Sequence, residues 1–113
     1  MVADYIPQRE DVIWLDFNPQ AGHEQAGKRP ALVLSPKTYN HKTGLLLACP
    51  ITSKIKGYPF EVVLSEELPV KGAILADQIK SLDWQARDAQ FACQVSEPIL
   101  ADVIEKITLL LER

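Results

Sequence analysis

The chain of 113 residues is 47% hydrophobic and 24% charged, and its formal net charge is −3. This length fits one domain, residues 1–113, and the apolar content allows a real core and excludes a disordered chain. No stretch approaches the roughly 18 apolar residues of a membrane span, and the first residues lack the apolar region of a secretory signal, so we expect a cytoplasmic protein with no membrane partner.

The first predicted strand covers residues 12–17, and a long polar connection over residues 19–28 follows it. Connections of this length inside a small domain are usually either functional or mobile. The connection leads to Pro30, which holds Arg29 in an extended backbone and is tolerated as the first residue of a strand. We therefore expect Arg29 at the mouth of a buried strand formed by residues 31–34.

A second apolar run covers residues 45–51, and the polar stretch 37–44 before it suits the connector of a hairpin. If pairing begins at the ends of this connector, with Pro36 opposite the first residue of the run, the same register places Arg29 opposite Thr52. Directly opposite residues have Cβ atoms about 5 Å apart. The sequence therefore predicts that a guanidinium and a hydroxyl meet at one end of the sheet.

Further strands are predicted over residues 60–64, 72–79 and 91–95. The tail then changes period, because the apolar residues from Ile99 to Leu111 recur at the spacing of one helical face. Ser96 suits the N-cap of this helix, and Pro98 is tolerated in its first turn. Many short strands followed by one amphipathic helix predict an α+β fold that is mostly β, a small curled antiparallel sheet or barrel capped by the C-terminal helix.

The charges are distributed unevenly along the chain. Residues 97–112 hold four acidic side chains and one lysine, which equals the whole net charge of −3. Since charges in solution act over a Debye length of about 8 Å, a local basic surface can still attract phosphate. An ordinary solvated surface is the alternative. The stretch 25–60 has six basic side chains and no acidic one: Lys28, Arg29, Lys37, Lys42, Lys54 and Lys56.

No cofactor is predicted. Cys49 and Cys93 both lie in apolar, strand-like runs, so reduced, buried thiols are expected rather than a disulfide. His23 and His41 are 18 positions apart in loops, and no carboxylate pair has the spacing of metal ligands. A glycine-rich phosphate-binding motif is also absent from the sequence.

Segments of the chain resemble the toxin ribonucleases of the MazF/PemK/Kid family of bacterial toxin–antitoxin systems. They are DVIWLDFNPQAGHEQAGKRPALVLSP at 11–36, ACPITSKIKGYPFEVVL at 48–64 and ADQIKSLDW at 76–84, and the resemblance extends over essentially the whole chain. It implies a small SH3-like antiparallel barrel of the CcdB/PemK type and a homodimer. It also implies sequence-specific, metal-independent cleavage of single-stranded RNA, chiefly messenger RNA, which would stop translation and growth.

RNA brings its own nucleophile to such a reaction, because the 2′-hydroxyl can attack the adjacent phosphorus and leave a 2′,3′-cyclic phosphate and a 5′-hydroxyl. The forked donors of a guanidinium fit the charged phosphorane of the transition state, so we assign Arg29 to electrostatic stabilisation. Proposals for the family also give this arginine an acid–base role, but a guanidinium holds its proton to about pH 12 and is a poor base near neutrality. Thr52 would donate its hydroxyl to a non-bridging oxygen or orient the attacking group.

Glu24 is the first candidate for the proton acceptor. It lies on the long connection, five residues before Arg29, and a carboxylate beside an arginine stays ionised. His23 is the alternative, because an imidazole titrates near neutral pH. Each of these side chains, and His41 as well, could instead be an ordinary solvated loop residue.

The expected phosphate contacts are Lys28, Lys54 and Lys56, which flank both catalytic candidates. Phe17 is either a core residue or a platform on which an unpaired base stacks. In the 76–84 segment, Gln78 and Lys80 resemble family positions near the groove. The full set of expected RNA-binding residues is Phe17, His23, Gln25, Lys28, Ser53, Lys54, Lys56, Gln78 and Lys80.

The expected protein partner is a cognate antitoxin whose acidic C-terminal segment, in extended form, occupies the basic groove in place of RNA. Two other interpretations stay open at this point. One is a gyrase-poisoning toxin of the CcdB type, which cleaves nothing, although the ending Leu109–Arg113 lacks the terminal aromatic residue expected for it. The other is an RNA-binding barrel with no catalytic activity.

Overall fold

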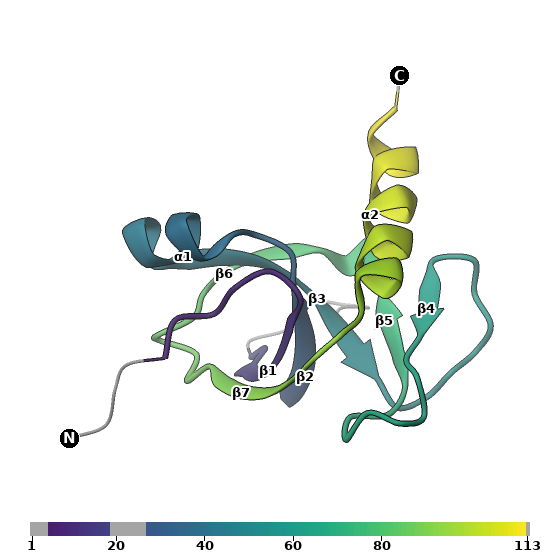
Figure 1. Cartoon of the computed structure of the whole chain (residues 1–113), viewed down its shortest axis with the longest axis horizontal. Helices are drawn as coiled ribbons and strands as arrows, with labels where there is room; N and C mark the ends of the chain where they lie inside the picture. The colour runs from purple at the N-terminus through teal and green to yellow at the C-terminus, as the bar shows by residue number, and fades with distance from the viewer. Residues whose placement is uncertain (1–4, 19–26, 113) are drawn as a thin grey trace.

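The computed structural model describes residues 5–18 and 27–112, and within them seven strands pair in antiparallel fashion (Figure 1). The strand order is β4-β5-β3-β2-β1-β7, and β6 pairs with β3 as well. The strands are β1 (Asp11–Asp16), β2 (Lys28–Val33), β3 (Leu45–Thr52), β4 (Glu61–Val63), β5 (Ala73–Leu75), β6 (Lys80–Asp83) and β7 (Gln90–Gln94). The helices are α1 (Lys37–Thr43), the short 3₁₀ helix η1 (Ala76–Gln78) and α2 (Glu97–Leu111).

The eight-residue strand β3 is the centre of the sheet. Its partner on one edge is β2. Its other edge is shared, because β6 pairs with Leu45 to Ala48 whereas β5 pairs with Ile51 and Thr52. The strands therefore wrap around one another rather than lie flat, as Figure 1 shows. The predicted class, a mostly antiparallel β fold with a C-terminal helix, is confirmed.

Both faces of the central strands are buried, in two separate apolar clusters. Successive residues of a strand point to opposite faces. Val12 and Leu32 accordingly enter the cluster beneath α2, while Ile13 and Ala31 enter the other. Because both faces of these strands pack against apolar side chains, polar side chains can reach solvent mainly at the ends of the strands.

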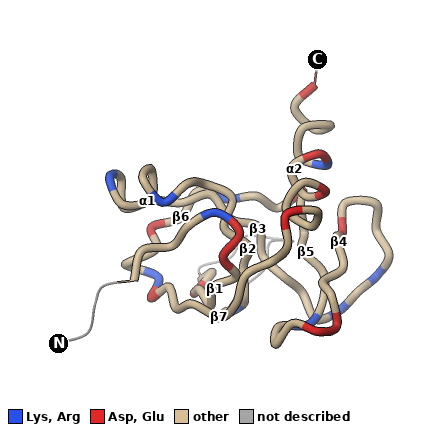
Figure 2. The backbone as a smooth tube through the Cα atoms, viewed as in Figure 1, with Lys and Arg blue, Asp and Glu red and all other residues tan. Residues whose placement is uncertain are grey.

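The C-terminal helix α2 begins after Ser96, as predicted, although in the described structure the Ser96 hydroxyl makes no capping hydrogen bond. Leu100 and Val103 bury the face that packs on the sheet. Acidic residues are spaced along the helix in Figure 2, which places much of the negative charge on this element. None of the helices in the described part of the chain is long and apolar enough to cross a membrane.

The polar stretch 37–44 connects the β2–β3 hairpin as predicted, but Lys37–Thr43 form a helix, α1, rather than a loop. The helix places Asn40 in the interior, where its side chain donates to the carbonyl oxygens of Pro7 and Ser35 at 2.8 and 3.1 Å and accepts the Ser35 hydroxyl at 2.6 Å. Helix α1 ends at Gly44, whose φ of +73° suits a residue without a side chain. The polar stretch is helical because the helix lets the Asn40 side chain form its hydrogen bonds in the protein interior.

The prediction of one strand over 72–79 is also wrong in part. The chain forms β5, turns through η1 and continues as β6. Ala76, at the start of η1, is fully buried and donates its N–H to the carbonyl of Phe60 at 3.0 Å. This bond continues the β4–β5 pairing, and η1 then separates β5, which pairs with the end of β3, from β6, which pairs with its beginning. Asp77 and Gln78 of η1 line the cleft at the end of β3.

Candidate active site

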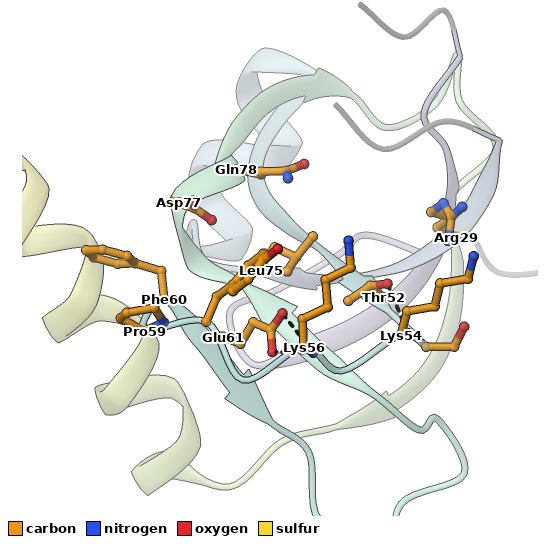
Figure 3. A pocket seen from close by; sticks show the side chains of 12 residues that line it. Arg29, Thr52, Lys54, Lys56, Pro59, Phe60, Glu61, Leu75, Asp77 and Gln78 are labelled. Atoms are coloured by element: carbon orange, nitrogen blue, oxygen red, sulfur yellow. Dashed lines mark hydrogen bonds between the residues drawn. The ribbon is translucent and has the colours of Figure 1, made fainter. Parts of the chain in front are cut away.

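A cleft of about 730 Å³ opens at the end of β3 (Figure 3). Five parts of the chain line it: the start of β2, the end of β3, the loop 53–60, the first residue of β4 and the segment from β5 into η1. The lining residues are Arg29, Thr52, Ser53, Lys54, Lys56, Tyr58, Pro59, Phe60, Glu61, Leu75, Asp77 and Gln78.

Arg29 and Thr52 are brought to this cleft by the predicted register. The structure pairs Ala31 with Pro50 and Leu32 with Cys49, which is the register expected for the β2–β3 hairpin. Continued by two residues, it sets Arg29 opposite Thr52, just beyond the last regular pair. Both side chains line the cleft, as Figure 3 shows. The predicted register, and the placement of Arg29 and Thr52 at the same end of the sheet, are therefore confirmed.

The Thr52 hydroxyl has a defined orientation. Only 8% of Thr52 is exposed, and its Oγ1 accepts the backbone N–H of Lys54 at 3.1 Å. Because Oγ1 accepts this bond, the hydroxyl hydrogen is available to donate toward the cleft. Arg29 is half-buried, which lowers the effective dielectric around its charge and strengthens its attraction for a phosphate.

The loop 53–60 is held in shape by a carboxylate. Glu61 accepts the backbone N–H groups of Lys56 and Gly57 at 3.1 and 2.9 Å. This leaves the Lys54 and Lys56 side chains exposed at the mouth of the cleft, and the Lys56 ammonium lies 5.7 Å from the ring centroid of Tyr58. The loop thus offers two cations and an exposed aromatic ring side by side.

Of the other predicted RNA-binding residues, Ser53 and Gln78 line the cleft. Gln78 is half-buried, and within the described part of the chain its Oε1 is buried without a hydrogen-bond partner. Lys28 and Lys80 do not line the cleft. Lys28 is exposed on β2 with its ammonium 3.6 Å from the Asp88 carboxylate, and Lys80 is half-buried on β6.

Phe17 is not available for stacking on a base. Only 1% of it is exposed, and it packs in the same cluster as Leu15 and Trp84, so of the two roles considered for it core packing is correct. Tyr58, for which the sequence predicts no role although it lies in the segment 48–64 that resembles the family, lines the cleft and is 61% exposed. The sequence signal for this residue is an aromatic side chain between Gly57 and Pro59, in a loop where it can be exposed to a ligand.

Three predicted residues, His23, Glu24 and Gln25, lie outside the residues that the structure describes. The two ends of their segment are described. The backbone N–H of Gly27 donates to the Asn18 side-chain oxygen at 3.0 Å, and the Arg87 guanidinium donates to the carbonyl of Asn18 at 2.7 Å. In the parts of the chain on either side of this segment, no three His, Cys, Asp or Glu side chains gather as a metal site would require.

Comparison with known proteins identifies the class. The family model of PemK-like, MazF-like toxins of type II toxin–antitoxin systems matches residues 8–111, so the chain belongs to this family. It is 50% identical over 111 residues to the endoribonuclease toxin MazF of Escherichia coli strain K12, covering 98% of this chain and 99% of that protein.

Solved structures agree with this assignment. A crystal structure of MazF from Deinococcus radiodurans matches with a TM-score of 0.93 and 54% identity, over 96% of this chain and 98% of that one. A MazE–MazF structure from the same organism matches with a TM-score of 0.85 and 47% identity, over 96% and 97% of the two chains.

Proposed function

We propose that the protein is a sequence-specific endoribonuclease toxin that cleaves single-stranded RNA, messenger RNA above all, and so inhibits translation and growth. One observation carries the proposal: Arg29 and Thr52, from neighbouring strands, line one cleft together with Lys54 and Lys56. Relatives at 50% identity that are named endoribonucleases support it.

The cleft residues suit attack by the RNA 2′-hydroxyl on the adjacent phosphorus, without a metal. Arg29 presents forked donors to the non-bridging oxygens, where negative charge develops in the transition state. The Thr52 hydroxyl donates to one of these oxygens while its own oxygen is held by the Lys54 N–H. The new bond from the 2′-oxygen to phosphorus displaces the 5′-oxygen, which takes a proton from solvent and leaves as the 5′-hydroxyl of the downstream fragment, and the upstream fragment ends in a 2′,3′-cyclic phosphate.

The proton of the attacking 2′-hydroxyl passes to Glu24 in this proposal, with His23 as the alternative. Glu61 is poorly placed to accept it, because its carboxylate already accepts the N–H groups of Lys56 and Gly57. Lys54 and Lys56 attract the phosphates on either side of the cut. Tyr58 offers the aromatic face that Phe17 cannot, and an unpaired base stacks on such a face without regard to its identity.

The test uses the purified protein and single-stranded RNA in the presence of a chelator. We expect cleavage into fragments with 2′,3′-cyclic phosphate and 5′-hydroxyl ends, identified by mass spectrometry. The same RNA with a single 2′-deoxy nucleotide at the mapped cut should survive. If no natural RNA is cleaved, the proposed endoribonuclease activity is rejected and the gyrase-poisoning alternative is favoured. If the 2′-deoxy RNA is cleaved, the 2′-hydroxyl mechanism is rejected.

The structures of MazE–MazF complexes support a second part of the proposal, that a MazE-type antitoxin neutralises this chain. We infer that an acidic segment of the antitoxin occupies the cleft and contacts Lys54 and Lys56. A MazE-type antitoxin should then compete with uncleavable 2′-deoxy RNA for the protein. The predicted homodimer belongs to the same proposal, and analytical ultracentrifugation of the purified protein tests it.

A further inference from the structure

Gly72 lies directly before β5, between the C-terminal end of β4 and the end of β3. It is buried and has a φ of +126°, a conformation that favours glycine. On one side its carbonyl accepts the N–H of Leu64 at 2.9 Å. On the other side, a Cβ added at this position would lie 2.0 Å from the Thr52 carbonyl oxygen and 2.9 Å from its carbonyl carbon. No side chain fits there unless the backbone moves.

This contact sets Gly72 apart from the other glycines in the described residues. Gly27, Gly44 and Gly57 also have positive φ, at +78°, +73° and +78°, but a Cβ at any of them would meet nothing within 4 Å. At these three positions glycine is favoured only by the backbone conformation. At position 72 a side chain would also collide with neighbouring backbone atoms. The atoms that need this space belong to Thr52, the hydroxyl residue of the cleft.

The Thr52 side of the contact is the one that can yield. The segment that begins at Gly72 is held against β4 independently of Thr52, through the Leu64–Gly72 hydrogen bond and the pair of Val63 with Ala73. Thr52 is the last residue of β3, and Ser53 beyond it is exposed. A side chain at position 72 would therefore push the end of β3 away from β5 and carry the Thr52 hydroxyl with it.

We propose that Gly72 is a positioning residue for RNA cleavage: by lacking a side chain it lets β5 hold the Thr52 backbone, and so sets the Thr52 hydroxyl against the reacting phosphate beside Arg29. The inference rests on the proposed function. It adds a residue that touches neither substrate nor cleft and acts through Thr52. A displacement of about 1 Å at a catalytic group can cost on the order of 10² in rate, so a small backbone shift is enough.

The experiment is a double-mutant cycle on RNA cleavage with Gly72→Ala, Thr52→Ala and both together. Assays are run in sucrose, which favours the folded state, and circular dichroism checks folding of each variant. We expect Gly72→Ala to lower kcat by about 10- to 100-fold. Its Kd for RNA with a 2′-deoxy nucleotide at the cut should stay within about threefold of the wild type, since the phosphate-binding lysines remain. In the Thr52→Ala background the same change should cost less than about threefold, because coupled residues are not additive.

Gly44→Ala is the matched control. It introduces the same methyl group at positive φ, at the end of α1, where the space is open. Its kcat should stay within about twofold of the wild type.

An equal loss from Gly72→Ala in both backgrounds would overturn the inference, because the residue would then act independently of Thr52. A Gly72→Ala protein that stays unfolded in sucrose would overturn it as well, since the clash would disrupt the whole sheet rather than the end of one strand. If the wild-type protein cleaves no RNA, the proposed function fails instead, and that outcome is seen before any variant is compared.

Discussion

Arg29 and Thr52 line the same cleft, and the β2–β3 register, continued beyond its last regular pair of Ala31 and Pro50, sets them opposite each other. The residue between Arg29 and this ladder is Pro30, which has no N–H to donate. At this end of the β2–β3 ladder each residue is held by the strand on its other side, because Arg29 pairs with Leu15 of β1 and Thr52 pairs with Ala73 of β5. This is where a polar group can be held firmly by the sheet and still reach a ligand.

Replacing Arg29 with alanine should lower kcat for RNA cleavage by about 10²–10³, the usual effect of removing one donor that stabilises a transition-state charge. Arg29→Lys keeps the charge but loses the forked donors, so it should recover only part of the loss. Steady-state kinetics on a short RNA with one mapped cut site measures both. The exposed Lys42 of α1 supplies the control, because Lys42→Ala removes a charge away from the cleft. A loss below threefold for Arg29→Ala, with the fold intact, would remove Arg29 from the mechanism.

Lys54 and Lys56 should determine how RNA binding depends on salt. Each phosphate contact on a single strand contributes about 0.7 to the slope of log K against log salt concentration. Lys54→Ala and Lys56→Ala should therefore each reduce this slope by about 0.7, measured by fluorescence anisotropy with uncleavable RNA. Lys37→Ala and Lys42→Ala, on α1, should leave it unchanged. An equal reduction for all four variants would mean that RNA senses overall charge rather than this cleft.

Gln78 should show opposite effects on stability and function. Its Oε1 is buried without a partner in the described structure, which costs roughly 1–3 kcal/mol. Gln78→Met fills similar space without the polar atoms and should raise the free energy of unfolding by about 1 kcal/mol, measured by urea denaturation. The same change should weaken discrimination between RNA sequences, because the amide can pair with a base edge in the cleft. Gln85→Met, at an exposed turn, should change neither quantity. Lower stability with unchanged sequence preference would show that Gln78 is a structural residue.

The Cys49 thiol should be unreactive in the folded protein, and it should make the free energy of unfolding decrease at alkaline pH. Burial, and secondarily the negative charge of Asp77, raises the pKa of its thiol from 9.0 to about 12. Above pH 9 the unfolded chain loses this proton while the folded protein keeps it, so the free energy of unfolding falls as the pH rises. Urea denaturation between pH 8 and 10 should show a steeper decline for the wild type than for Cys49→Ala.

Thiol labelling gives a second measurement of the same property. Both cysteines are free, and Cys93 is half-buried whereas Cys49 is buried. Iodoacetamide at pH 8 should therefore modify Cys93 first, and Cys49 only as fast as the protein unfolds. Rapid labelling of Cys49 in the native protein would contradict its burial.

Much of the fold could be predicted because its signals are local. The alternation in residues 12–17, the buried run 45–51 and the helical period after Ser96 each reappear as an element, and the β2–β3 register follows from counting along a hairpin. The errors arose where distant contacts override local preference. Residues 37–43 form a helix because Asn40 bonds to Pro7, far away in the sequence, and the strand that begins at Ala73 ends at Leu75 because the chain beyond η1 pairs with a different part of β3.

By itself the sequence determined the pairing of Arg29 with Thr52, since register depends on residue number and on which faces must be buried. It also determined the family, through motifs spread along the chain. Only the tertiary structure decided that Phe17 belongs to the core, that Glu61 shapes the loop carrying the lysines, and that Gly72 must leave room for Thr52. These are contacts between segments far apart in sequence, and their geometry depends on how the whole sheet bends, a property that no local pattern encodes.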